Sequence, residues 1–345
     1  MKYIIVILKT PYWILSVLTQ AKSFKDNPII GSRLLNVMGL HCIRILFAKL
    51  SCMIRWFILA PMMPQNYRRQ FHRDGYLLLE NFLTPEKVAA IRRDIKAYAG
   101  PARQLIQGNT ATQRILLDDA ALRKTPSLSW VSHHRILKSY LNYTGAKVAS
   151  PLLYLQRIRN GLKADNEDPQ KNIHSDTFHP TVKAWLFLED VTDEKGPFTY
   201  VPSSNQLTFK RLKWEYLKSI NAASIQDKYS EKGSMRASID DLNILGLPKP
   251  KAITAKAGTL VIANTNGFHA RGQAKAGASR LEVWAYSRYN PFNPFPGLPL
   301  PFAKIIKDKV LHFFWHRADV RAAKRNSKSS WHLIESSDML EDIDT

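Results

Sequence analysis

Short apolar runs predict a series of β-strands through the middle of the chain. The run at residues 280–289, RLEVWAYSRY, alternates apolar and polar positions, as a strand with two unlike faces does. Other apolar runs predict strands at residues 76–82, 152–159, 182–188, 198–201 and 259–263. We therefore expect a mainly β core of the α+β class.

One helix is marked at both of its ends. Thr84 and Pro85 form a start signal, with Thr as the N-cap and Pro at the first helical position. A Gly-Pro pair stops the helix, so we expect it to run over about residues 85–98. Residues 102–150 look helical and loop-like and carry no motif of their own.

The predicted strands group into one domain, residues 67–291, which contains an insertion at residues 203–250. The insertion is charged, rich in lysine and helix-prone at residues 209–220. Insertions of this kind often border the mouth of a site, but a solvated elaboration without contact to substrate fits the sequence equally well. Extensions at residues 1–66 and 292–345 flank the domain.

The first 66 residues predict an apolar, basic and helical extension. Its first two apolar runs, residues 3–8 and 12–18, are interrupted by Lys9 and Pro11. Both runs are shorter than the stretch of about 20 apolar residues that spans a membrane. We expect a segment that packs on the protein or lies on a surface.

A second helix in this extension, within residues 34–63, combines a largely apolar surface with one polar stripe. His41, Arg44, Ser51 and Arg55 follow one another at intervals of three, seven and four residues, so they share a helical face. Such a helix either lies in the headgroup region of a membrane or covers the protein core while its arginines reach out to water. The sequence leaves both alternatives open.

The C-terminal extension predicts three successive kinds of structure. Five prolines at residues 291–301 exclude a helix or a central strand and indicate a stiff, extended wrap. Residues 303–325 mix Lys, Arg and His with aliphatic and aromatic residues, which predicts a basic amphipathic helix. The acidic tail, residues 335–345, is predicted to be disordered.

Composition restricts the class of protein and of partner. A chain of 345 residues that is 45% hydrophobic and 23% charged is globular rather than disordered. Its two cysteines, Cys42 and Cys52, lack a zinc spacing and provide no disulfide framework, which favours a reducing compartment. The net charge of +22 calls for an acidic partner. Because the N-terminal basic residues lie among long aliphatic ones, an anionic membrane surface fits better than a nucleic acid.

The candidate chemistry centres on residues 172–202. His174 and Asp176 are two positions apart, so both side chains leave the same face of an extended segment. His269 follows a predicted buried strand and a polar turn. Two imidazoles and one carboxylate form the facial triad of non-haem iron sites, which leaves positions open for oxygen and a co-substrate. The sequence therefore predicts His174, Asp176 and His269 as metal ligands.

Arg280 lies eleven residues after His269, at the start of the last predicted strand. Its guanidinium can hold a carboxylate by two parallel hydrogen bonds. Together with this arginine, the ordered blocks HSD, LEDV, GPFTYVPSS and GTLVIANTNGFH resemble the phytanoyl-CoA dioxygenase family. Residues 71–95 are similar to the opening strand and helix of that family, so the resemblance covers about residues 71–291. The family spacing favours Arg280 over Arg271 as the carboxylate clamp.

The resemblance implies a double-stranded β-helix, or jelly roll, with flanking helices. It implies an oxygenase that uses Fe(II), 2-oxoglutarate and O2, with ascorbate as a further candidate cofactor. By the same resemblance His174, Asp176 and His269 bind iron, Arg280 binds the distal carboxylate of 2-oxoglutarate, and Gln156 contacts this co-substrate. The implied reaction hydroxylates a C–H bond and releases succinate and CO2.

The distribution of charge is the sequence's one indication of the substrate. Basic, apolar ends suggest a lipid or lipid-linked substrate and a cytoplasmic enzyme that lies peripherally on the inner face of a membrane. A small soluble metabolite is the next candidate, and no nucleic-acid partner is expected. The alternative class is a non-catalytic β-helix module that binds anionic lipid or another acidic partner. The complete ligand set and the arginine favour the enzyme, because a binding module needs neither.

Overall fold

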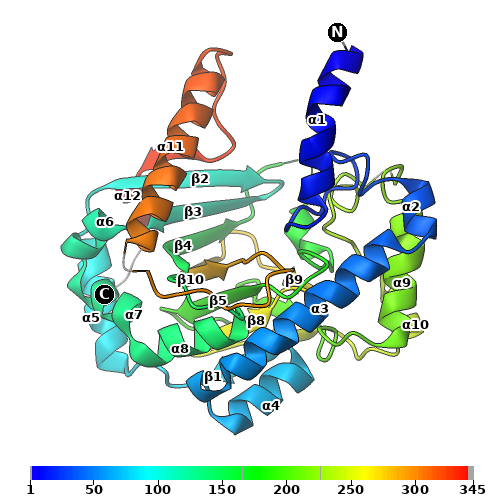
Figure 1. Ribbon diagram of the computed structural model, residues 1–345. Coiled ribbons are helices and arrows are strands. Elements are labelled where there is room, and N and C mark those ends of the chain that lie inside the picture. The colour runs from blue at the N-terminus through cyan, green and yellow to red at the C-terminus, as the bar shows by residue number, and fades with distance from the viewer. Residues whose placement is uncertain (1, 165, 226, 301, 341–345) are drawn as a thin grey trace.

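The computed structural model describes residues 2–164, 166–225, 227–300 and 302–340, and side chains from residue 9 onward. Two antiparallel sheets form its centre and helices surround them (Figure 1). The strands are β1 (Tyr76–Leu79), β2 (Pro101–Gln107), β3 (Thr110–Leu116), β4 (Leu152–Asn160), β5 (Val182–Phe187), β6 (Phe198–Tyr200), β7 (Lys251–Ile253), β8 (Leu260–Asn264), β9 (His269–Arg271), β10 (Ser279–Ser287) and β11 (His332–Glu335). The helices are α1 (Lys2–Ser16), α2 (Arg33–Val37), α3 (Leu40–Ile58), α4 (Gln65–Asp74), α5 (Pro85–Lys96), α6 (Asp119–Lys124), α7 (Pro126–His133), α8 (Arg135–Thr144), α9 (Phe209–Ile220), α10 (Ile239–Leu245), α11 (Ala303–Ala323) and α12 (Ser336–Leu340).

Eight strands form the larger sheet in the order β1-β8-β5-β10-β4-β3-β2-β11, and three form the smaller sheet in the order β7-β6-β9. The predicted mainly β core of the jelly-roll class, with flanking helices, is confirmed. Among the described residues the two sheets are not joined into a closed barrel. The helical extensions at both ends of the chain are also present.

The alternation in β10 explains how the larger sheet is built. Leu281, Val283 and Ala285 pack into a hydrophobic cluster with α5, α7 and α8. Trp284 and Tyr286 point to the opposite face and pack with residues of the smaller sheet. Because side chains alternate across a strand, one face of β10 builds the core and the other is available for a site between the sheets.

The prediction for residues 102–150 is wrong in its first part. Residues 101–116 form the hairpin of β2 and β3, which pairs with β4, and helices α6, α7 and α8 follow. Gly108 occupies the turn with a positive φ of 54°, and a Cβ there would lie 2.5 Å from the Asn166 carbonyl oxygen. The signal that was missed is Gly108-Asn109 between two runs of β-forming residues.

The N-terminal extension packs differently from both alternatives that the sequence left open. Helix α1 runs through Pro11 without interruption. The polar stripe of α3 faces the protein: His41, Arg44, Ser51 and Arg55 are all buried. This polar stripe neither meets headgroups nor reaches out to water, because its side chains bond to backbone and acidic groups of neighbouring segments. None of the described helices is long and apolar enough to span a membrane.

The insertion at residues 203–250 supports the site from outside. Helix α9 lies against α2 and α3, and Glu215 accepts a hydrogen bond from His41 at 3.0 Å. Farther along, the Ser175 amide donates to the Met235 carbonyl, and the Ala237 amide donates to the Ile173 carbonyl. The insertion therefore pairs with the segment that carries the predicted metal ligands, although none of its described residues lines the cavity beside them.

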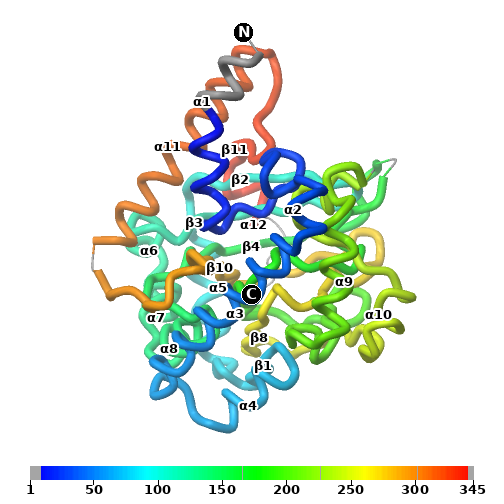
Figure 2. Tube along the Cα trace, turned by 45° about the vertical axis from the view of Figure 1, so that its right-hand side comes forward, coloured from blue at the N-terminus to red at the C-terminus, as the bar shows by residue number. Residues whose placement is uncertain are grey.

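The C-terminal extension is ordered farther than predicted. After the proline-rich wrap, α11 projects from the same end of the body as α1 (Figures 1 and 2). Strand β11 then pairs with β2, and α12 buries Met339 and Leu340 against the sheet. The prediction of disorder is thus wrong for residues 335–340, and residues 341–345 lie outside the described part. The predicted division at residues 66 and 291 stays a prediction, and α4 crosses its first boundary.

Candidate metal centre and substrate cavity

Backbone pairing places the two predicted histidine ligands side by side. The His174 amide donates to the His269 carbonyl and the His269 amide donates to the His174 carbonyl, both at 2.9 Å. Residues paired in this way project their side chains from the same face of the two segments. The Asp176 amide donates to the Thr265 carbonyl, which fixes the third predicted ligand beside them.

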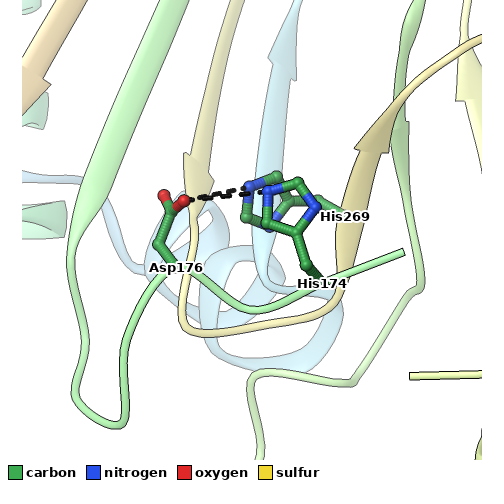
Figure 3. Close-up of side chains that lie close together, drawn as sticks. All are labelled: His174, Asp176 and His269. Atoms are coloured by element: carbon green, nitrogen blue, oxygen red, sulfur yellow. Dashed lines mark ion pairs between the residues drawn. The ribbon is translucent and has the colours of Figure 1, made fainter. Parts of the chain in front are cut away.

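The three predicted ligand side chains converge on one another (Figure 3). Oδ1 of Asp176 lies 3.8 Å from Nε2 of His174 and 3.7 Å from Nε2 of His269. The two imidazole centroids are 4.5 Å apart, and the three donor atoms lie within 4.8 Å of one another. The structure thus brings together the residues that the sequence proposed.

Each imidazole presents its Nε2 atom to this centre because its other nitrogen is engaged. Nδ1–H of His174 donates to the Asn172 carbonyl at 2.7 Å, and Nδ1–H of His269 donates to the Gly267 carbonyl at 2.9 Å. These bonds fix the tautomer whose Nε2 lone pair is free. Nε2 of His269 is buried and lacks a hydrogen-bond partner among the described residues, as expected of an atom that binds a metal.

The protonation states also suit a divalent metal. Burial is the largest cause that lowers the pKa of His269, to about 4, and it holds the pKa of His174 well below the ordinary range. Burial alone would raise the pKa of Asp176. The Lys183 ammonium is the largest opposing cause, and the pKa lies well below its usual range. At neutral pH the donors are therefore two neutral imidazoles and one carboxylate.

A cavity of about 310 Å³ opens beside these donors, between the sheets. Its described lining contains a single acid, Asp176, but five cations, Arg114, Lys183, Arg271, Arg280 and Arg288. Aromatic rings of Trp185, Phe198, Trp284, Tyr286 and Trp331 complete much of the wall. The cavity is therefore cationic and partly aromatic, which suits an anionic or polar ligand better than a bare hydrocarbon chain.

Arg280 and Gln156, the predicted co-substrate residues, both lie in the cavity wall and share one acid. Glu282 is fully buried, accepts from Nε of Arg280 at 3.1 Å, and accepts from Nε2 of Gln156. Arg280 also donates to the Gly196 carbonyl. Arg271, the competing arginine, donates to Asp168 at 2.6 Å and so has an acidic partner outside the cavity lining.

Several lining residues were not singled out from the sequence, among them Arg114, Trp331 and Arg288. Arg114 comes from the missed hairpin, donates to Gln156 at 2.6 Å and lies over the Trp284 ring, 3.9 Å from its centroid. Trp331 just precedes the missed strand β11. Arg288 ends the alternating run that begins at Arg280, and this spacing could have identified it, because even-numbered residues there share the cavity face.

Other polar and aromatic residues near the predicted ligands lie inside or outside the cavity. Lys183 and Trp185 both line it. His179 is buried outside it, with Nδ1–H donating to the Pro180 carbonyl. The adjacent histidines His133 and His134 lie at the junction of α7 and α8 and do not line the cavity.

The comparisons with known proteins address the family. A sequence model of the family described as Phytanoyl-CoA dioxygenase (PhyH) matches residues 71–281. No curated protein matches the chain. Among solved structures, it is similar to the non-heme alpha-ketoglutarate-dependent epimerase SnoN from nogalamycin biosynthesis, with 19% identity and a TM-score of 0.44 over 66% of this chain and 84% of that chain.

It is also similar to HygX from Streptomyces hygroscopicus, solved with nickel, 2-oxoglutarate and hygromycin B, with 16% identity and a TM-score of 0.41 over 66% of this chain and 87% of that chain. The match of the family model extends over more than half of the chain, from α4 into β10. The chain therefore belongs to the phytanoyl-CoA dioxygenase family and is an oxidoreductase that depends on iron and 2-oxoglutarate.

Proposed function

We propose that this protein hydroxylates a C–H bond of an organic substrate, with Fe(II) held by His174, Asp176 and His269. The observation that carries the proposal is the convergence of two neutral Nε2 atoms and one carboxylate oxygen within 4.8 Å at the cavity wall. Bound there, iron supplies the oxidising chemistry by which 2-oxoglutarate and O2 give succinate, CO2 and a hydroxylated product. The alternative, a non-catalytic module, has no support from the family assignment.

The chain's own residues would orient the ligands and neutralise charge. The Asn172 and Gly267 carbonyls hold both imidazoles with Nε2 toward the centre. Lys183 lies 2.7 Å from Oδ2 of Asp176, so it holds that oxygen while Oδ1 faces the imidazoles. Such outer contacts orient metal ligands before the metal arrives, which saves reorganisation on binding.

Arg280 would bind the distal carboxylate of 2-oxoglutarate. Its guanidinium lines the cavity, is nearly buried, and is held by Glu282 and the Gly196 carbonyl. A buried, oriented guanidinium matches a carboxylate geometrically. Gln156, held between Glu282 and Arg114, would border the same co-substrate.

The substrate would carry an anionic or strongly polar group. Arg114 and Arg288 line the cavity and form no ion pair with a described acid. Nε of Arg288 is buried without a hydrogen-bond partner. Arg280 and Arg288 are eight residues apart along β10 and its end, about 26 Å in an extended strand, so one small co-substrate cannot occupy both.

These features support a lipid headgroup or lipid-linked molecule as the finer substrate class, with a small anionic metabolite as its competitor. A cytoplasmic position on the inner face of a membrane remains part of the proposal. It is supported by two free cysteines, which fit a reducing compartment, and by the excess of basic residues.

The test measures succinate formed from 2-oxoglutarate in the presence of Fe(II) and O2, with membrane extract supplied as a source of substrate. We expect His174→Ala, Asp176→Ala and Arg280→Ala to lose turnover. His179→Ala, at a buried histidine outside the cavity, should retain it. Metal binding is measured separately by calorimetry with Co(II). Undiminished Co(II) binding by His174→Ala and Asp176→Ala would refute the proposed ligand set.

A further inference from the structure

Helix α3 is built with its polar face inward. Nε of Arg44 donates to the Val17 carbonyl at 2.9 Å, and its Nη2 donates to the Thr19 and Ala21 carbonyls at 3.3 and 2.6 Å. Arg55 donates to the Asn290 carbonyl at 3.0 Å. These contacts tie the α1–α2 connection and the proline-rich wrap to α3.

Two further contacts complete the inward face. His41 bonds to Glu215 at 3.0 Å, and Ser51 donates to the Phe292 carbonyl at 3.3 Å. Turning α3 over would leave the buried carbonyl groups that Arg44, Ser51 and Arg55 now satisfy without their donors. The orientation of the helix is therefore fixed by its polar side chains.

The consequence is an outward face made of large apolar side chains, here called the α3 face. Eleven of them, between 42% and 84% exposed, belong to α2, α3 and the turn between them: Leu34, Val37, Met38, Ile43, Leu46, Phe47, Leu50, Met53, Ile54, Phe57 and Ile58. Figure 1 shows α3 lying across the front of the body with no other element in front of it. A contiguous apolar face of this extent is unusual on a monomer in water and marks an interaction surface.

Charge around the α3 face identifies the partner. The two arginines of α3 itself, Arg44 and Arg55, are buried on its inward side, so the cations beside the face lie at its two ends. Arg33 is exposed where α2 begins, and Arg69 is exposed in α4, beyond the other end of α3. A second copy of this chain would bring the same positive face against itself. An apolar strip flanked by cations instead matches an anionic bilayer, which accepts apolar side chains below its charged headgroups.

Helix α11 also carries the apolar and basic side chains that suit an anionic bilayer. Its exposed residues include Phe313 and Phe314 together with Lys309, Arg317 and Arg321. It projects from the same end of the body as α1, whose exposed residues Tyr12, Ile14 and Leu15 are also apolar (Figures 1 and 2). Helices α1 and α11 thus present apolar and basic side chains, and neither has an exposed acid in its described part.

We propose that the α3 face docks on an anionic lipid surface. The docking rests on the membrane position in the proposed function, for which it names the contact surface, and it does not depend on the proposed reaction. On the inward side of the same helix, Arg44 holds the Ala21 carbonyl, and the ammonium of the next residue, Lys22, donates to the Asp176 carbonyl.

The experiment is vesicle flotation of the full chain with phosphatidylcholine alone and with added phosphatidylglycerol. The variant Phe47→Asp/Phe57→Asp places two charges on the α3 face, where these rings are 59% and 84% exposed. The matched control, Ile106→Asp/Ile244→Asp, changes residues that are 51% and 68% exposed on β2 and α10. We expect the wild type and the control to float with anionic vesicles and the α3 variant to lose at least tenfold in binding.

Succinate formation and circular dichroism show whether the α3 variant is folded, because neither ring belongs to the proposed site. Equal flotation of the α3 variant and the wild type would overturn the docking proposal, as would absence of the wild type from both kinds of vesicle. Molar mass by light scattering tests whether a second copy of this chain covers the α3 face instead. A dimeric wild type and a monomeric α3 variant, neither of which binds vesicles, would assign the face to a second copy. This result would refute the lipid proposal.

Discussion

The Lys183 ammonium lies 2.7 Å from Oδ2 of Asp176, whereas Oδ1 of the same carboxylate faces the imidazoles of His174 and His269. The two oxygens therefore have separate partners. Lys183 comes from the central strand β5, so a rigid element of the sheet determines how the carboxylate of a loop is turned. The same ammonium keeps the pKa of Asp176 low in a buried place.

Replacing Lys183 by Met is expected to weaken Co(II) binding about tenfold at neutral pH, because the carboxylate loses the contact that orients it. Lys183→Arg should recover part of the affinity, since a guanidinium can still donate to Oδ2. Calorimetry of Co(II) binding checks both variants. Unchanged or tighter binding by Lys183→Met would show that the ammonium acts mainly by repelling the metal.

Glu282 provides the corresponding test for the co-substrate. This fully buried acid holds Nε of Arg280 and Nε2 of Gln156. Glu282→Gln keeps the size but supplies one acceptor where two are needed, so Arg280 should lose its fixed orientation. We expect the KM for 2-oxoglutarate to rise about tenfold with a smaller change in kcat, because a positioning contact is lost.

The matched control is Glu231→Gln, which changes a buried acid that pairs with Lys25 outside the cavity. Its KM for 2-oxoglutarate should equal that of the wild type. Steady-state measurement of succinate over a range of 2-oxoglutarate concentrations distinguishes the two variants. An unchanged KM in Glu282→Gln would argue against Arg280 as the carboxylate clamp.

Local signals in the sequence were sufficient for the elements that build the metal centre. The strands predicted at residues 182–188 and 259–263 are β5 and β8, and the helix that begins at Pro85 is α5, two residues shorter than expected. These segments carry their own start, stop and alternation signals, which tertiary contacts did not override. His269 was found because it follows such a strand and Arg280 because it opens one, whereas His174 and Asp176 were found from their two-residue spacing.

What the sequence could not provide is the side of α3 that faces the protein. Periodicity placed Arg44, Ser51 and Arg55 on one stripe, and the structure has them on one stripe. Its direction depends on carbonyl groups of residues far along the chain, such as Asn290 and Phe292, which no local pattern encodes. The β2–β3 hairpin differs, because its turn signal, Gly108-Asn109, is local and is present in the sequence.

The inward direction of Arg44 can be tested by its contribution to stability. Arg44→Met is expected to lower the free energy of unfolding by about 3 kcal/mol, because three carbonyl groups lose a charged donor. Arg33→Met, at an exposed position where α2 begins, should change it by less than about 0.5 kcal/mol. Urea denaturation measures both. Equal effects would mean that Arg44 faces water or lipid.

Lys147 links the cavity to a pH-dependent stability. Its side chain is 6% exposed and donates to the Arg288 carbonyl at 2.8 Å. Burial, with smaller effects of Lys307 and Arg55, lowers its pKa from 10.5 to about 7. Between these two values the unfolded chain holds a proton that the folded chain has released. The free energy of unfolding should therefore increase as the pH rises from about 7 toward 10.5.

Lys147→Met removes this titration, so its stability should depend less on pH than that of the wild type. From about pH 7 to about pH 9 the wild type should gain on the order of 2 kcal/mol relative to the variant, because one unit of pKa shift corresponds to about 1.4 kcal/mol. Lys22, whose pKa is lowered to about 8 mainly by burial, titrates in both proteins and cancels in the comparison. Urea denaturation at several pH values measures the difference. Parallel curves would show that Lys147 keeps its proton in the folded protein and holds the Arg288 backbone as a cation.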